Sequence, residues 1–262
     1  MGWRVARIIA PRAGQRVSRR RTLWIGWVLA VLAIAGFARL GFWQYARMHE
    51  KQRILANAGE ALADRHAVPL WQAVEGKIAD ATGREFTWVE GEGAVDPRTL
   101  LLDNQLRNGR PGVRVYCLLR RDDANDARAV LVDLGWLRVD ARRDLPAQTC
   151  PRGPMQVRGL LARPPSSGLR MGSAMQEVGD GRWLATRIDA QSIAQAWHLA
   201  LPLPAEVLRL DPALPVGFER DLDILPNTMP PDRHLGYAVQ WWALALAVLI
   251  TALLLTLRKT RT

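Results

Sequence analysis

The sequence is poor in the residue patterns that most enzymes use for covalent or metal chemistry. Its 262 residues include only two cysteines, Cys117 and Cys150, with no C-x-x-C pair. The four histidines are scattered, and no two have metal-ligand spacing. The chain also lacks a G-x-S-x-G nucleophile motif, an H-E-x-x-H zinc motif, a Walker phosphate loop and an EF-hand loop. These absences disfavour a membrane-bound hydrolase. The histidines are His49, His66, His198 and His234.

Acidic residues are missing from both ends of the chain. Residues 1–22 hold seven arginines and no acid, and residues 258–262 hold three basic residues and no acid. These ten account for almost all of the net charge of +11, because the rest of the chain has 26 basic against 25 acidic residues. A basic groove for a nucleic acid would need the charge to be gathered on a folded surface. We therefore expect no nucleic-acid partner.

Each basic end adjoins a long apolar tract. The first runs from Leu23 to Phe42 and is interrupted only by Arg39, and the second runs for 21 uncharged residues from Tyr237 to Leu257. About 20 apolar residues are enough for a helix to cross a bilayer, so both tracts are predicted to be transmembrane helices. Basic flanks favour the cytoplasmic side, which places both tails there and the middle of the chain outside. The predicted divisions are a tail at 1–22, a first span at 23–43, an extracytoplasmic domain at 44–233, a second span at 234–257 and a tail at 258–262.

The N-terminal tract has an alternative interpretation. Ser18-Arg19-Arg20-Arg21-Thr22-Leu23 resembles a twin-arginine export signal, and Ala33-Ile34-Ala35 has the small residues of a cleavage site. A cleaved signal would leave only the C-terminal anchor. Apolar residues continue past this site to Phe42, which favours an uncleaved span.

Between the spans, short apolar runs alternate with turn residues, a sequence pattern typical of β-strands. Gly91-Glu92-Gly93 is one of the predicted turns, and Asp189 is predicted to cap a short helix ending near Leu199. The fold class predicted is a membrane protein with two transmembrane helices flanking one mainly-β (α+β) domain, an antiparallel barrel-like or sandwich structure. The candidate strands are Glu85–Glu90, Thr99–Asn104, Val113–Arg120, Ala129–Val139, Met155–Ala162, Trp183–Ile188 and Val207–Leu210.

The two cysteines fall in this outer domain. An extracytoplasmic compartment is oxidising, which would allow Cys117 and Cys150 to pair. The alternative for Cys117, which lies in an apolar run, is a small buried residue without a partner.

The entrance to the C-terminal span carries the candidate functional residues. At about 100° per residue, His234, Tyr237 and Trp241 fall on one stripe of the helix, with Ala238 and Ala245 beside it. This sets an imidazole at the boundary between bilayer and water. The plainer interpretation is a membrane anchor with an interfacial aromatic belt.

A second set of candidates lies on the outward extension of the first span. Gln44, Arg47 and Lys51 share one helix face at i, i+3 and i+7. This face is either a solvated surface or a basic lip for an anionic partner or for the propionates of a cofactor.

Three stretches taken together resemble the Surfeit locus protein 1 family. They are Leu40-Gly41-Phe42-Trp43-Gln44-Tyr45-Ala46-Arg47 followed by Lys51, Ala129–Leu137 with the glycine-containing stretch Asn108–Val115 ahead of it, and Asp232–Ala245. Their order and topology match the family from about residue 24 to residue 257. The family often has an arginine before the central Gly-Trp, where this chain has Leu134.

The resemblance implies an assembly factor for haem–copper cytochrome c oxidase in the bacterial inner membrane, with a periplasmic domain. It implies oxidase subunits and assembly machinery as partners, membrane lipid around the spans, and haem a as a cofactor. His234 matches the proposed axial ligand of the haem iron. Arg233, Arg47 or Lys51 would pair with the propionates, and Tyr237 or Trp241 would stack on the ring. The competing function is a scaffold that stabilises oxidase intermediates and binds no haem.

Overall fold

The computed structural model describes residues 19–79, 85–121, 127–140, 145, 147, 150–164, 172–225 and 228–260. The chain forms two compact units. The first, called here the helix pair, lies within Met1–Glu50 and Pro230–Thr262, and the second, called here the β domain, is Lys51–Met229. Much of the two predicted basic tails, residues 1–18 and 261–262, lies outside the described residues.

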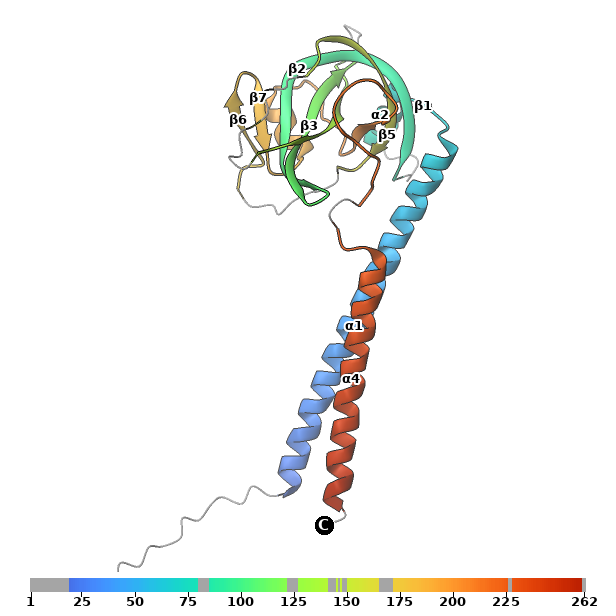
Figure 1. The fold of residues 1–262 in the computed structure, drawn as a ribbon, viewed down its shortest axis with the longest axis vertical. Helices are drawn as coiled ribbons and strands as arrows, with labels where there is room; N and C mark the ends of the chain where they lie inside the picture. Colours follow the sequence, from blue (N-terminus) through green and yellow to red (C-terminus); the bar gives the residue numbers. More distant parts are fainter. Residues whose placement is uncertain are drawn as a thin grey trace, which may run out of the picture. The chain divides into compact units, whose positions relative to one another are not determined.

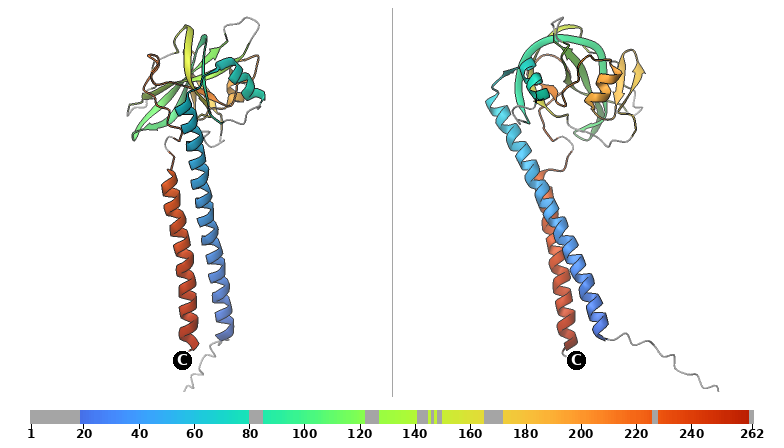
Figure 2. Two further views of the ribbon diagram at one scale, coloured as in Figure 1. Left: turned by 90° about the vertical axis from the view of Figure 1, so that its right-hand side faces the viewer. Right: turned by 180° about the vertical axis from the view of Figure 1, so that it is seen from behind.

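The helix pair consists of most of α1 (Arg19–Asp64) together with α4 (Pro231–Thr260). No proline interrupts α1, and α4 begins with a proline followed by Asp232 in its first turn, which suits the start of a helix. Both helices contain a stretch long and apolar enough to cross a membrane. They run side by side (Figures 1 and 2), and the start of α1 lies beside the end of α4.

In its described residues, the β domain holds eight strands and two short helices besides the end of α1. The helices are α2 (Leu70–Ala79) and α3 (Ala190–Ala196). The Asp189 side chain accepts a hydrogen bond from the Ser192 amide and caps α3, as predicted, although the helix ends before Leu199. The strands are β1 (Val68–Pro69), β2 (Thr87–Arg107), β3 (Arg110–Arg120), β4 (Ala129–Arg138), β5 (Gly153–Ala162), β6 (Met175–Gly179), β7 (Arg182–Ala185) and β8 (Val207–Leu210).

All eight strands belong to one sheet, in the order β3-β4-β8-β5-β2-β7-β6, with β1 also on β2. Because β2 pairs with β3 as well as with β5, five of the strands form a closed circuit of pairings. The long strand β2 curves strongly to reach both partners (Figure 1). The sheet is mixed and not purely antiparallel as predicted, since β1–β2, β2–β7 and β4–β8 are parallel pairs. The mainly-β character of the domain is confirmed.

The turn predicted at Gly91-Glu92-Gly93 is wrong, because these residues lie inside β2. The two glycines serve close packing instead of a turn. A Cβ on Gly91 would come within 2.8 Å of the Leu70 side chain, and one on Gly93 within 2.9 Å of Leu119. Glycine at these positions lets α2 and β3 approach the strand.

Among the residues described, three apolar clusters hold the β domain together. The largest takes alternate residues from the five strands of the circuit, for example Val89, Val115, Val132, Leu161 and Leu208. A second cluster packs α3 against the other face of β2, β3 and β4, and a third packs the end of α1 against β2 and β5. The strands therefore bury side chains on both faces, which is why they read as nearly continuous apolar runs.

A disulfide joins Cys117 on β3 to Cys150, which lies just before β5. Both residues are buried in the largest cluster. The backbone amide of Cys150 also donates a hydrogen bond to the Thr99 hydroxyl, at 3.0 Å. Of the two sequence-based alternatives for Cys117, the structure adopts the paired one.

Candidate functional site: the contact between α1 and α4 at His234

One face of α4 packs against α1, and His234 is the first buried residue of that face. His234, Ala238 and Ala245 are buried, although they lie on a helix whose other residues are mostly exposed. Their spacing of four and then seven residues keeps them on one side of the helix. The alanines leave room for α1 to come close, so the histidine ring is held between the two helices.

The His234 ring bonds to the opposite helix. Its Nδ1 lies 2.6 Å from Oε1 of Gln44 on α1, and the side chain is only 7% exposed. An amide oxygen can only accept a hydrogen bond, so Nδ1 carries the proton in this pair. In the neutral ring the lone pair is then on Nε2. Gln44 thus fixes both the orientation and the tautomer of the imidazole.

Aromatic rings meet farther along the same helix contact, on the side of this hydrogen bond toward the end of α4. Trp241 stacks on Phe37 of α1 with 5.6 Å between ring centroids, and Trp242 meets the edge of Phe42 at 5.5 Å. The Trp242 indole occupies the space beside Gly41, where a Cβ would collide with it. The helix contact therefore passes from a polar pair at His234 to large packed rings at Trp241 and Trp242.

The predicted site residues divide into two groups. His234 and Trp241 both contact α1, whereas Tyr237 is 42% exposed and Arg233 is also exposed. The difference follows from helix geometry, because the buried face is centred between His234 and Ala238, and Tyr237 lies at its margin.

The two basic residues of the predicted basic lip have partners within the chain. Arg47 donates to Glu50 one turn later on α1, at 2.6 Å, and both side chains are about half exposed. Lys51 belongs to the β domain, where its Nζ donates to the Met229 carbonyl at 2.5 Å. An ion pair this exposed contributes little to stability, so Arg47 can exchange Glu50 for another anion at small cost.

The residues that sequence reasoning missed are those of α1 that face His234. Helical spacing groups Gln44 with the basic lip and points to no role for Phe37 or Gly41. The sequence does carry one signal. Gln44 is a neutral polar residue in an aromatic stretch at the end of the apolar tract of α1, and His234 occupies the corresponding place on α4. Their pairing depends on how the two helices are placed along each other, which neither helix encodes alone.

A second concentration of polar groups lies inside the β domain. Arg114 on β3 donates to Asp133 on β4 at 2.6 Å, and both are almost fully buried. Burial lowers the pKa of Arg209 nearby, and burial followed by the Asp133 carboxylate raises the pKa of Tyr116 well above its ordinary value. The other oxygen of Asp133 accepts from the Gly135 amide at 3.0 Å. With both its oxygens engaged, Asp133 serves to join two strands.

No group of three histidine, cysteine, aspartate or glutamate side chains converges as a metal site in the part of the chain that the structure describes. A haem iron needs only one or two axial ligands from the protein. The single histidine at the helix contact is therefore the position to examine for such a role.

The sequence model of the SURF1 family matches residues 31–246. This span takes in the helix contact from Phe37 and Gln44 to His234 and Trp241, together with the whole β domain. The chain belongs to the SURF1 family, which is associated with cytochrome oxidase assembly and consists of assembly factors, not catalysts. The resemblance seen in the three sequence stretches is confirmed. No curated protein sequence matches the chain.

Proposed function

We propose that this protein is an inner-membrane assembly factor for haem–copper cytochrome c oxidase that binds haem a through His234 and aids its delivery to the oxidase. Family membership supports the assembly role. The observation that carries the haem-binding part is the hydrogen bond from His234 Nδ1 to Gln44, at 2.6 Å.

The chemistry of this pair fits an axial ligand. Iron-binding histidines donate their second ring N–H to a protein acceptor, which fixes the tautomer and makes the binding nitrogen more basic. Gln44 provides that acceptor, so Nε2 is the nitrogen suited to iron. When bound, haem a supplies the redox-active iron that the oxidase requires.

The burial of His234 sets a condition on binding. With the side chain only 7% exposed, Nε2 meets a bulky ligand only after the aromatic contact between α1 and α4 loosens or the side chain turns outward. Trp241 and Phe37 would then offer flat apolar faces to a porphyrin ring, and the exposed Arg233 and Arg47 would offer cations to its propionates. A site that must open to load also suits a protein that releases its cargo.

The proposed orientation places both helix ends in the cytoplasm and the β domain in the periplasm. The basic residues at both ends of the chain favour the cytoplasmic side. The disulfide between Cys117 and Cys150 favours an oxidising compartment for the domain. Reporter fusions at each end and within the β domain test this, and a periplasmic report from either end would contradict it.

A scaffold that binds no haem is the second candidate. The same hydrogen bond favours it, because a buried polar pair between two membrane helices also serves to hold them in register. If the protein is such a scaffold, His234 and Gln44 contribute equally to one structural hydrogen bond, and removing either residue should have the same effect.

Absorption spectroscopy distinguishes the two proposals. Protein purified in detergent from cells that make haem a should show a Soret band, which His234→Ala should abolish because the ligand itself is removed. Gln44→Ala should retain a weaker or shifted band, because it removes only the group that orients the ligand. Loss of such a group that supports a metal ligand lowers metal affinity by about 10- to 100-fold. Oxidase assembly in the host should fall in the same order.

The matched control is His49→Ala, which removes an exposed histidine from α1 and should leave the spectrum unchanged. Equal membrane abundance of all variants must be shown by immunoblot. A wild-type protein without a Soret band, or equal losses of oxidase assembly in the His234 and Gln44 variants, would favour the scaffold.

A further inference from the structure

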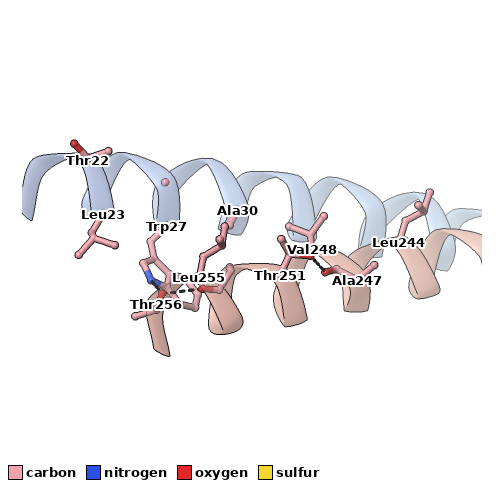
Figure 3. A pocket seen from close by; sticks show the side chains of 12 residues that line it. Thr22, Leu23, Trp27, Ala30, Leu244, Ala247, Val248, Thr251, Leu255 and Thr256 are labelled. Atoms are coloured by element: carbon pink, nitrogen blue, oxygen red, sulfur yellow. Dashed lines mark hydrogen bonds between the residues drawn. The ribbon is translucent and has the colours of Figure 1, made fainter. Parts of the chain in front are cut away.

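The helix pair changes character along its length. Near His234 large aromatic rings fill the space between α1 and α4. Toward the start of α1 and the end of α4, glycine and alanine occur among the facing residues, and a groove of about 450 Å³ opens between the helices. Figure 3 shows the side chains that line it, which come from both helices. Gly26 and Ala30 on α1 and Ala247 and Ala252 on α4 leave this space.

Three of the polar side chains that line the groove, those of Trp27, Thr251 and Thr256, form hydrogen bonds within the helix pair. The Trp27 indole N–H donates to the Thr256 hydroxyl at 3.1 Å, and that hydroxyl donates to the Ala252 carbonyl at 2.8 Å. Thr251 likewise donates to the Ala247 carbonyl on its own helix (Figure 3). An occupant gains little from hydrogen bonding here, so an apolar chain fits the groove best.

The charges at this end of the helices specify what such a chain is attached to. α1 begins with Arg19-Arg20-Arg21 immediately before Thr22, which lines the groove, and α4 carries Arg258 and Lys259 just after Thr256. In the sequence of the helix pair the acidic side chains are Glu50 on α1 and Asp232 in the first turn of α4, both far from the groove along their helices. Arg21, the basic residue described beside the groove, therefore has no acidic side chain of the helix pair near it in the sequence.

We infer that this groove binds an anionic phospholipid, with an acyl chain lying between the helices and the phosphate held by Arg21, which directly precedes the groove residue Thr22. Basic sites between membrane helices hold such headgroups by charge. A transmembrane helix of a partner is the other possible occupant. With its side chains it is about 10–12 Å across, so it would enter the groove with one row of side chains and leave Arg21 without an anion.

The variant Gly26→Leu tests the acyl part. A Cβ at Gly26 meets no atom within 4 Å, so a larger side chain enters the groove without a clash. Gly36→Leu is the matched control, because Gly36 is on the same helix, has the same free space around its Cβ and does not line the groove. Ala247→Leu fills the groove from α4 and serves as a second test if the first variant fails to fold.

The measurement is lipid retained per chain after detergent purification, by native mass spectrometry, followed by titration of delipidated protein. The titrants are phosphatidylglycerol and phosphatidylcholine with identical acyl chains. The wild type and Gly36→Leu should retain phosphatidylglycerol, and Gly26→Leu and Ala247→Leu should lose it. Arg21→Gln should weaken phosphatidylglycerol binding about fivefold, the effect expected for one basic residue beside an anionic headgroup, and should leave phosphatidylcholine binding unchanged.

Three results would overturn the inference. Equal binding of the two lipids would show that Arg21 does not select the headgroup. Undiminished lipid retention in both groove-filling variants that fold, as judged by circular dichroism, would show that the groove is not the site. Loss of a co-purifying membrane protein from these variants, with lipid retention unchanged, would assign the groove to a partner helix.

Discussion

The disulfide between Cys117 and Cys150 should make a large contribution to the stability of the β domain. The perturbation is the double variant Cys117→Ala/Cys150→Ala, compared with the wild type in the absence and presence of a reducing agent. The two cysteines are 33 residues apart in sequence. Opening the bond gives the unfolded chain more conformational freedom and has little effect on the folded domain, where both positions are buried.

The size of the effect follows from the length of the closed loop. In the chain-entropy description, a loop of this length is worth about 3.7 kcal/mol at 25 °C. The hydrogen bond from the Cys150 amide to the Thr99 hydroxyl uses the backbone and survives substitution. With a urea dependence of about 2 kcal/mol per molar, the unfolding midpoint should fall by about 2 M.

Urea titration of the full chain in detergent micelles, followed by tryptophan fluorescence, gives this midpoint. Reductant should lower the wild-type midpoint toward that of the double variant and should leave the double variant unchanged. A midpoint in the double variant within 0.3 M of the wild type would refute the reasoning, because it would mean that the bond does not constrain the unfolded chain (an effect below about 0.6 kcal/mol).

Asp133→Asn should lower the free energy of unfolding of the β domain by about 3–5 kcal/mol, because it leaves the buried Arg114 without its carboxylate; denaturant titration checks this, and a loss below 1 kcal/mol would contradict it. Acidification should remove a separate contribution. Burial alone would raise the pKa of Asp96, but hydrogen bonds and charge from Arg98 and Arg120 lower it from 3.8 to about 2. A carboxyl with a lowered folded-state pKa stabilises the fold above pH 4 and loses that contribution as the pH falls toward 2, so Asp96→Asn should flatten the stability profile in that window, and an unaltered profile would argue against it. Arg47→Gln should reduce oxidase activity in the host while protein level holds, and unchanged activity would mean that Arg47 is only solvated.

Local patterns predicted most strands of the β domain, for a physical reason. Runs such as Val113–Arg120 and Ala129–Val139 are rich in β-branched and apolar residues and end at turn residues, so each could be found alone. The parallel pairings of β8 with β4 and of β7 with β2 could not be predicted in this way, because parallel pairing joins segments far apart in the chain and leaves no local signal. The two glycines of β2 misled for the same reason, since their packing partners lie on other elements.

The candidate site was predictable to the same extent. Helical periodicity was enough to group His234 with Trp241, and length and charge were enough to place them at the end of an apolar helix. Periodicity grouped Tyr237 with them as well, although α1 covers only the neighbouring part of that face. The choice of Gln44 as the partner of His234 follows from the packing of one helix on another, which a single-helix pattern does not contain.

The position of β8 has a consequence for the order in which the protein is made. This strand of four residues lies between β4 and β5 and completes the circuit of five strands. A ribosome has synthesised both neighbours long before residues 207–210 emerge, so until then each presents an edge of unpaired backbone groups to any other extended chain. Until β8 is made, the exposed edges of β4 and β5 can also pair wrongly with other strands of the growing chain. Nascent chains that end before β8 should accordingly be cut by added protease within the β domain, and chains that extend past it should resist.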